Sequence, residues 1–290
     1  MMSSGDTTIS LSEPPKTGNL YLKAALGAVP LLSARRSEIP DRAVELSGVR
    51  VDPDQLAAYC HATGLRFGDA LPLTYPFVLT FPLVMSLVVA RDFPFAAVGA
   101  VHAENLIERG RDISVSQPLD IRAHVENLRE HPRGLLVDAI SEISVGRERV
   151  WRQVTTFLHQ QKTSLSGGPR PEPKPDEVPP PPLRTLRVDQ ALIHRYAAAS
   201  GDRNPIHMSG LSARAFGFSR AIAHGMWSAA AILGVIEGRV AAATTYSVKF
   251  GKPILLPATV NAYAERAGTG WDLSLKHPKK GYPHLTATLR

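Results

Sequence analysis

Apolar and polar residues alternate along six segments of the chain, three in each half. Such a period of two, with frequent β-branched and aromatic residues, is typical of β-strands that have one buried face. A segment with helical spacing precedes each group of three. The pattern therefore predicts an α+β fold, with a helical region followed by an antiparallel meander in each half. The six predicted strands cover residues 121–129, 135–143, 149–159, 259–266, 271–276 and 284–290.

The two halves resemble each other in sequence. Val51-Asp52 heads a helical segment that ends in AYCHATGL, and Val188-Asp189 heads one that ends in RYAAASGD, at an offset of 137. Further on, ERGRDISV at 108–115 parallels KFGKPILL at 249–256, at an offset of 141. The chain is therefore predicted to contain two copies of one structural unit.

Composition also divides the chain between the two predicted copies. Residues 162–184 are rich in proline and show no apolar periodicity, which is typical of a semi-rigid linker. Residues 1–18 are polar and are predicted to form a loose tail. The two predicted domains are then 19–161 and 185–290.

One uncharged apolar stretch, residues 71–90, is long enough to cross a bilayer. It contains three prolines, each of which would remove a helical hydrogen bond. After Pro82 only about a dozen apolar residues remain before Arg91, which favours a buried core helix over a membrane span.

The remaining composition limits the compartment and the partners. The single cysteine, Cys60, excludes an internal disulfide framework, and the first ten residues lack the pattern of a secretory signal. We therefore predict a soluble cytoplasmic protein.

The net charge of +7 suits an anionic partner: nucleic acid, a membrane surface, or an acidic small molecule or carrier protein. No zinc-finger spacing, RNP-type motif or basic heptad region is present, so a nucleic-acid partner would rest on charge alone and none is predicted.

The segment from Tyr196 to Gly225 contains the candidate chemistry. Gly201 is suited to end a helix, which leaves Asp202 at the start of a loop. Asn204-Pro205 predicts a turn that fixes the backbone before His207. A carboxylate and an imidazole that both contact one water can activate it and return its proton elsewhere, so the spacing indicates general acid–base catalysis.

A second element follows at 221–233, where His224-Gly225 stands just ahead of an alanine-rich apolar helix. A helix start offers unpaired N–H groups and a positive dipole end, which suit a developing oxyanion. Glycine at this position lets a substrate carbonyl approach the backbone closely.

These residues resemble the MaoC-like family of (R)-specific enoyl-CoA hydratases and 3-hydroxyacyl-thioester dehydratases. The resemblance is carried by Tyr196, Ser200-Gly201-Asp202, Asn204-Pro205, His207 and the run from Ile222 to Met226. It implies the hot-dog fold, in which an antiparallel sheet wraps around a long helix. Two such units in one chain imply a double hot dog, which is an internal pseudo-dimer.

The resemblance also implies roles for individual residues. Asp202 and His207 match the catalytic pair, Asn204 helps to order their loop, and the N–H of Gly225 matches the oxyanion donor. The implied reaction is the reversible addition of water to a trans-2-enoyl thioester, which needs no metal and no redox cofactor. The candidate substrate contacts are Arg203, His224 and Met226, with a solvated loop residue as the alternative for Arg203 and a turn-shaping histidine as the alternative for His224.

The first half lacks this pair. At the offset of 137, Leu65 stands in place of Asp202 and Ala70 in place of His207. We therefore predict that this half is non-catalytic and shelters the acyl chain, with residues 71–90 lining the tunnel and Leu83 as a test position.

Two other functions remain open. One is a hot-dog acyl-thioesterase, and the other is a non-catalytic subunit that binds acyl thioesters. The sequence also leaves open the acyl chain length, the direction of the reaction, the choice between CoA and acyl carrier protein, and the association of two chains into a homodimer.

Overall fold

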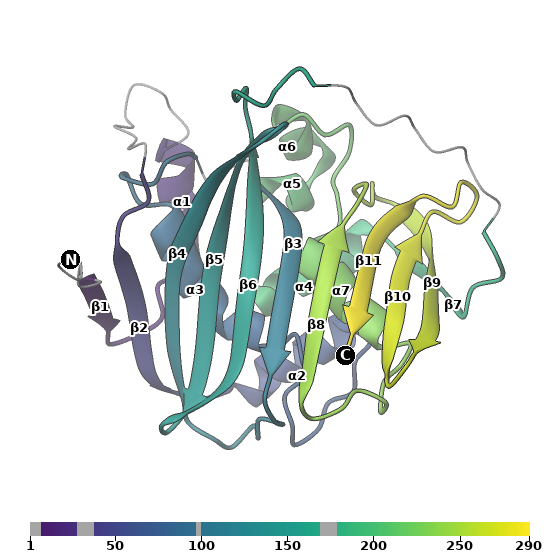
Figure 1. The fold of residues 1–290 in the computed structure, drawn as a ribbon, viewed down its shortest axis with the longest axis horizontal. Helices are drawn as coiled ribbons and strands as arrows, with labels where there is room; N and C mark the ends of the chain where they lie inside the picture. The colour runs from purple at the N-terminus through teal and green to yellow at the C-terminus, as the bar shows by residue number, and fades with distance from the viewer. Residues whose placement is uncertain (1–6, 28–37, 97–99, 169–178) are drawn as a thin grey trace.

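The strands of both halves join in one curved sheet. The computed structural model describes residues 7–27, 38–96, 100–168 and 179–290. Their eleven strands lie in the spatial order β1-β2-β4-β5-β6-β3-β8-β11-β10-β9-β7 (Figure 1). All neighbours are antiparallel except β1 and β2, which are parallel. The strands are β1 (Thr7–Leu11), β2 (Arg42–Val49), β3 (Val101–Arg109), β4 (Leu119–His131), β5 (Gly134–Val145), β6 (Glu148–Gln160), β7 (Arg184–Val188), β8 (Thr244–Phe250), β9 (Ala258–Ala267), β10 (Gly270–Lys276) and β11 (Pro283–Leu289).

The two halves repeat one strand order about a local axis. The first half reads β2-β4-β5-β6-β3 and the second, from its own edge, reads β7-β9-β10-β11-β8. The halves meet where β3 pairs with β8, and Leu106 lies opposite Ser247 there. These two residues differ by 141 positions, the offset found in the sequence, so the pseudo-twofold axis passes through this pair.

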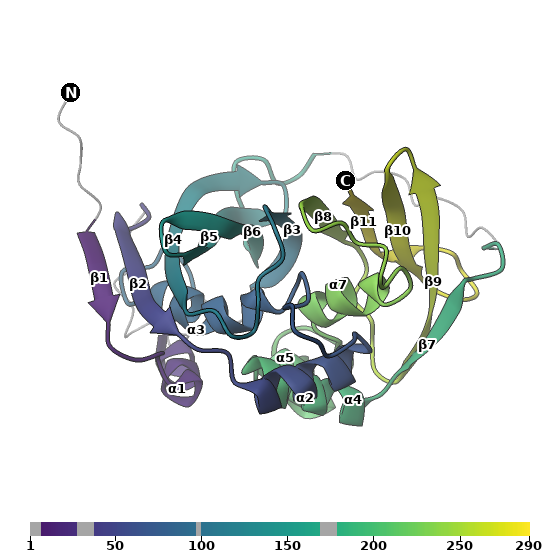
Figure 2. The same ribbon diagram turned by 90° about the horizontal axis from the view of Figure 1, so that it is seen from below.

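Helices fill and cover the curled sheet. Helix α3 lies inside the first curl of the sheet and α7 inside the second (Figure 2). Helices α2 and α4 pack against each other and lie below α3 and α7 in this view. This confirms the predicted α+β arrangement of two helix-and-sheet units, although α7 is shorter than the long helix that the resemblance implied. The helices are α1 (Thr17–Gly27), α2 (Pro53–Thr63), α3 (Pro76–Val88), α4 (Gln190–Ser200), α5 (Pro205–Met208), α6 (Gly210–Ala215) and α7 (Gly225–Leu233).

The repeat is clearest in α2 and α4. Asp52 and Asp189 cap the two helix starts by accepting backbone N–H bonds, and both helices end at a glycine with φ of 74°. Their buried tyrosines, Tyr59 and Tyr196, contact each other with ring centroids 5.9 Å apart. All six strands predicted from alternation are present as β4, β5, β6, β9, β10 and β11.

The predicted loose tail is wrong for residues 7–11 and 17–18, which lie in regular elements. Thr7–Leu11 forms an edge strand beside β2, and α1 begins at Thr17. Thr7 to Ser10 are exposed, so this strand needs no buried face and shows no apolar alternation. Residues 1–6 of the predicted tail lie outside the described residues, as do residues 169–178 of the predicted linker.

The apolar stretch 71–90 contains a buried core helix, as predicted. Helix α3 runs from Pro76 to Val88 and continues through Pro82. None of the helices in the described part of the chain is long and apolar enough to cross a bilayer.

The halves differ in length just after α2 and α4. Leu71 N–H donates to the carbonyl of Ile113, and the equivalent bond runs from Ala223 to Ile254. Ala70 bridges Ser114 and Ile222 bridges Leu255 in the same way. The offset here is 152 instead of 137, so the second half contains 15 additional residues. The pairing of Ala70 with His207 is therefore wrong: Ala70 corresponds to Ile222, and the segment that holds His207 is an insertion.

Candidate active site

The loop after α4 carries the predicted acid at its start, and the inserted segment that continues it carries the predicted base. Gly201 takes up the left-handed conformation and its N–H donates to the carbonyl of Ala197, which ends the helix and turns Asp202 into a loop. Asn204 caps α5 by accepting the N–H of Ile206 at 3.3 Å, with Pro205 at the first helical position. His207 lies in this single turn of helix.

The hydrogen bonds of His207 define its tautomer. Its Nδ1 lies 2.8 Å from the carbonyl oxygen of Ile222, which can only accept, so Nδ1 carries the proton. The lone pair of the neutral ring is then on Nε2. The backbone carbonyl of His207 also accepts a bond from Gln190 at 2.7 Å, which fixes the turn from below. His207 is therefore oriented as a proton acceptor through Nε2.

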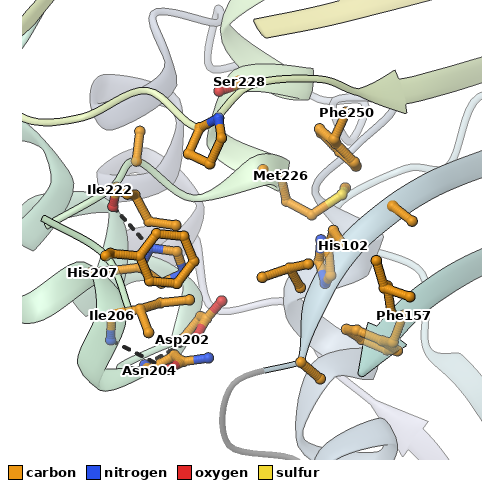
Figure 3. A pocket seen from close by; sticks show the side chains of 18 of the residues that line it. His102, Phe157, Asp202, Asn204, Ile206, His207, Ile222, Met226, Ser228 and Phe250 are labelled. Carbon is orange, nitrogen blue, oxygen red and sulfur yellow. Dashed lines mark hydrogen bonds between the residues drawn. The ribbon is translucent and has the colours of Figure 1, made fainter. Parts of the chain in front are cut away.

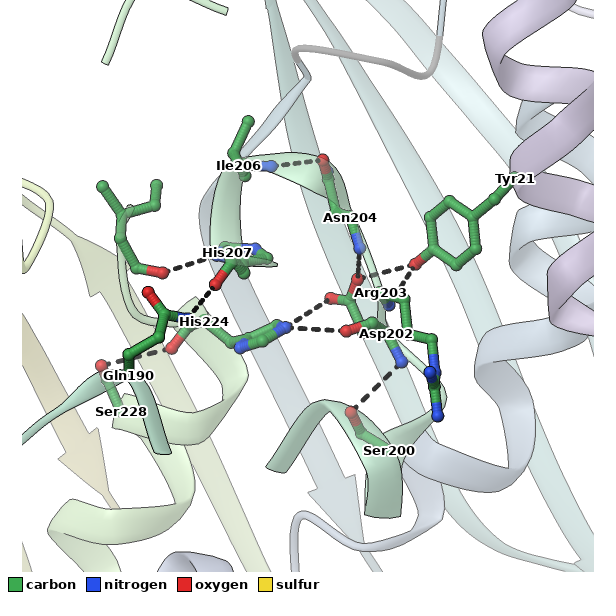
Figure 4. Close-up of polar contacts among 11 residues, drawn as sticks. Tyr21, Gln190, Ser200, Asp202, Arg203, Asn204, Ile206, His207, His224 and Ser228 are labelled. Atoms are coloured by element: carbon green, nitrogen blue, oxygen red, sulfur yellow. Dashed lines mark hydrogen bonds and ion pairs between the residues drawn. The ribbon is translucent and has the colours of Figure 1, made fainter. Parts of the chain in front are cut away.

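Asp202 is held at both its side chain and its backbone (Figure 4). Its Oδ1 accepts the hydroxyl of Tyr21 at 2.8 Å and the N–H of Asn204 at 3.2 Å. Its backbone carbonyl accepts Nε2–H of His224 at 2.9 Å, and its N–H donates to the hydroxyl of Ser200 at 3.3 Å. The carboxylate thus has one orientation, and Oδ2 lies 3.9 Å from His224 Nε2.

His224 packs against the pair formed by Asp202 and His207. Its ring stacks on that of His207, with centroids 3.7 Å apart, and it is 1% exposed at the N-cap of α7. The ring also lies 5.0 Å from that of Tyr196. His224 therefore fixes both the loop of Asp202 and the start of α7.

Burial and neighbouring groups set the charges of the site. Burial alone would raise the pKa of Asp202, but nearby His224 and His207 and hydrogen bonds from Tyr21 and Asn204 outweigh it and hold the pKa below its usual value. Burial lowers the pKa of His207, although Asp202 opposes this, and lowers that of His224 to about 3. At neutral pH the site therefore contains a carboxylate and two neutral imidazoles.

A cavity of about 260 Å³ lies in front of this pair, between the two halves. Figure 3 shows Asp202 and His207 on one side and His102 and Phe157 on the other. The catalytic side is lined by residues of the second half, and the opposite side by apolar residues of the first. The apolar lining of the first half includes Phe81, Met85, Val88, Phe95, Val101, Val137, Phe157 and Leu158.

Gly225 opens α7 and lines the same cavity. A Cβ at this position would come within 3.2 Å of the Phe250 ring, which is closer than side-chain atoms normally approach. The first N–H groups of a helix have no partner within the helix, so this end can receive a negatively charged oxygen.

The structure brings most of the predicted site residues together. Asp202, Asn204, His207, Gly225 and Met226 all line the cavity. Arg203 and His224 do not belong to its lining: Arg203 is exposed and uses its backbone N–H to bond Tyr21, and His224 is behind the loop. The geometry therefore supports a positioning role for His224 and gives no support to direct substrate contact by these two side chains.

Three of these side chains have the spacing of metal ligands. Asp202, His207 and His224 each offer a donor atom, and these atoms lie within 4.8 Å of one another. However, Nε2–H of His224 donates to the carbonyl of Asp202 and Nδ1–H of His207 to that of Ile222. Hydrogen bonding therefore accounts for the orientation of both rings, which is the arrangement of a proton-transfer site.

Two residues of the first half were missed by sequence reasoning. Tyr21 bonds Asp202 across 181 positions of the chain. His102 faces the cavity between the rings of Phe157 and Phe250, and burial lowers its pKa to about 4. No spacing in the sequence connects either residue to the loop; only the internal repeat indicated that the halves meet.

Comparison with known proteins agrees with this geometry. The profile of the MaoC like domain matches residues 169–287. The 3-hydroxyacyl-thioester dehydratase X of Mycobacterium tuberculosis is 53% identical over 280 residues, which cover 97% of this chain and 99% of that protein. The chain belongs to the MaoC-like dehydratase family.

Solved structures of this family have the same fold. The crystal structure of HtdX from Mycobacterium tuberculosis superposes with a TM-score of 0.78 at 52% identity, covering 86% of this chain and 99% of that one. A MaoC-like dehydratase from Phytophthora capsici gives a TM-score of 0.66 at 17% identity, covering 85% and 94%. The sheet and helices described above are thus the double hot dog of MaoC-like dehydratases.

Proposed function

We propose that this MaoC-like protein is an (R)-specific hydro-lyase, which interconverts trans-2-enoyl thioesters and (R)-3-hydroxyacyl thioesters. The observation that carries the proposal is the pairing of an ionised Asp202 with a neutral His207, whose Nε2 holds a lone pair, in one cavity with the start of α7. The relationship to a 3-hydroxyacyl-thioester dehydratase supports the same reaction class.

The protonation states define the path of the proton. In the hydration direction, a water held by Asp202 Oδ2 and His207 Nε2 attacks Cβ of the enoyl group while Nε2 takes one of its protons. The electron pair of the double bond moves onto the thioester oxygen. The imidazolium, stabilised by the nearby carboxylate, then returns the proton to Cα on the same face. Dehydration is the reverse of these steps.

Gly225 stabilises the charge that develops on the thioester oxygen. Its N–H lies at the positive end of α7, and the absence of a side chain leaves room for the oxygen beside Phe250. Met226 follows Gly225, lines the cavity and contacts the acyl group near the reacting carbons.

The rest of the cavity suits an acyl chain and its carrier. Apolar side chains of α3, β5 and β6 shelter the chain, while the exposed cations Arg133 and Lys252 lie where the cavity meets solvent. These cations suit the phosphate-bearing arm of CoA or of an acyl carrier protein. The buried free thiol of Cys60 is consistent with a reducing compartment, and we place the reaction in the cytoplasm.

The test is the loss of enoyl absorbance when purified protein is added to trans-2-enoyl-CoA of short, medium and long chain. We expect hydration to the (R)-alcohol. Asp202→Asn and His207→Ala should each lower kcat by about 10²-fold or more, which is the usual effect of losing a general acid or base. Rates near wild type in either variant would contradict the roles assigned here.

The same assay separates the other functions. A thioesterase would release free thiol, which a thiol reagent detects. A binding subunit would leave every thioester intact while still retaining it in an equilibrium binding experiment. Either result would overturn the hydro-lyase proposal.

A further inference from the structure

One helix of the first half contacts the catalytic loop of the second. Thr17, Tyr21 and Ala24 lie at positions i, i+4 and i+7 of α1, so they share one face of the helix. The Tyr21 hydroxyl lies 2.8 Å from Asp202 Oδ1 and 2.8 Å from the backbone nitrogen of Arg203. Ala24 lines the cavity itself.

Thr17, on the same face of α1, packs against the end of α4. A Cβ at Gly201 would lie 3.5 Å from Cγ2 of Thr17, so the end of α4 packs against the first turn of α1. Buried Leu20 and Ala24 fix the helix in place. Helix α1 therefore covers the loop from Gly201 to Arg203 by both packing and hydrogen bonding.

We propose that Tyr21 is a positioning residue for the reaction, which orients the carboxylate of Asp202 from the non-catalytic half. Its hydroxyl donates to Oδ1 and accepts the N–H of Arg203, so one group fixes both the side chain of the acid and the backbone that follows it. The inference rests on the proposed hydro-lyase function.

The two carboxylate oxygens of Asp202 therefore have different partners. Oδ1 accepts both close bonds that the described residues make to this carboxylate, from Tyr21 and from the Asn204 N–H. Oδ2 is left to face the reacting water. Burial, with the charge of Asp202, raises the pKa of Tyr21, which therefore stays protonated and remains a donor across the working pH range.

The first experiment compares Tyr21→Phe with the matched variant Tyr263→Phe. The Tyr263 hydroxyl also makes two bonds, to the carbonyl of Pro180 at 3.0 Å and from Asn261 Nδ2 at 3.4 Å, but on β9, away from the cavity. We expect Tyr21→Phe to lower kcat about tenfold or more with KM within about twofold, since it removes a hydrogen bond to a charged group. Tyr263→Phe should retain the wild-type kcat.

The pH profile separates positioning from a general structural defect. Tyr21 helps to lower the pKa of Asp202, so its loss should move the acid limb of kcat/KM to higher pH. A Tyr21→Phe variant with the wild-type kcat and an unshifted acid limb would overturn the proposal. So would an equal loss of kcat in Tyr263→Phe.

A second measurement does not depend on turnover. The Arg203 amide loses its acceptor in Tyr21→Phe, so amide hydrogen exchange in the peptide that spans 202–207 should become faster than in wild type and in Tyr263→Phe. Unchanged exchange would refute the contact. If the wild-type protein fails to hydrate any enoyl thioester, the proposed function fails, while this exchange result still decides whether Tyr21 holds the loop.

Discussion

At the scale of single residues, the two nitrogens of His207 have different tasks. Nδ1–H is bound to the carbonyl of Ile222, while Nε2 faces the cavity beside Asp202. A ring fixed in this way can take a proton only on the side where the substrate binds. The backbone carbonyl of Ile222 therefore determines which tautomer of His207 is present.

The lowered pKa of His207 predicts the pH dependence. The base must be unprotonated, so activity is lost as the pH falls through its pKa, and burial places that pKa below its usual 6.5. We expect the acid limb of kcat/KM to be centred below pH 6.5. Since Asp202 and His207 are coupled, the limb reports the pair as a whole. A limb centred at or above pH 6.5 would show that a different group, or a charged His207, controls the rate.

The environment of Gly225 predicts the effect of a single methyl group. Alanine keeps the N–H, but its Cβ would lie 3.2 Å from Cε1 of Phe250, so the ring or the start of α7 must shift. We expect Gly225→Ala to lower kcat about tenfold or more by moving the oxyanion donor. The double variant Gly225→Ala with Phe250→Leu should recover part of the loss because it removes the contact. Wild-type kcat in Gly225→Ala would mean that this N–H is not close to the reacting oxygen.

At the scale of elements, sequence patterns predicted the helices, strands and turns that are determined by residues close together in the chain. The six alternating strands and the local turn at Asn204-Pro205 could be found because their signals lie within a few residues. Strand β1 was missed because an exposed edge strand needs no apolar face. The contact of Tyr21 with Asp202 could not be predicted either, since it depends on how two distant elements pack.

Helix α3 is the element that sets the acyl compartment. Phe81, Met85 and Val88 face the cavity, whereas Leu83 is fully buried and is not part of the lining, so the test position expected from the sequence is replaced by Met85. We expect Met85→Trp to lower kcat/KM for long-chain enoyl thioesters about tenfold or more and to leave short-chain substrates within about twofold, because the indole fills the compartment. Equal effects at every chain length, measured in the same absorbance assay, would place the acyl chain elsewhere.

At the scale of the whole molecule, the two halves share one sheet and are joined by buried hydrogen bonds. The sheet runs without interruption through β3 and β8, and Trp227 Nε1 of the second half donates to the carbonyl of Ala62 in the first at 2.9 Å. Gln55 Nε2 donates in the opposite direction, to the carbonyl of Ala199 at 3.0 Å. Loss of either half would expose these groups and the tyrosine contact at the axis.

We therefore expect a single cooperative unfolding transition, with a calorimetric enthalpy equal to the van't Hoff enthalpy. Trp227→Phe should lower the Tm of that transition without splitting it, because it removes a buried hydrogen bond between the halves. Two transitions in a scanning calorimeter, or a loss of activity that precedes the main transition, would show that the halves unfold separately.

The 15 additional residues in only one half change what a substitution can do. In an assembly of two identical chains, every substitution is present in both copies. A change that widens the compartment for the acyl chain is then also present in the copy that holds the catalytic loop. Here the copies are covalently joined but no longer identical. The compartment of α3 can vary without altering the loop of Asp202, and each chain of 31.4 kDa carries one catalytic loop. A titration should accordingly saturate at one thioester per chain, half the number that two equivalent units would bind.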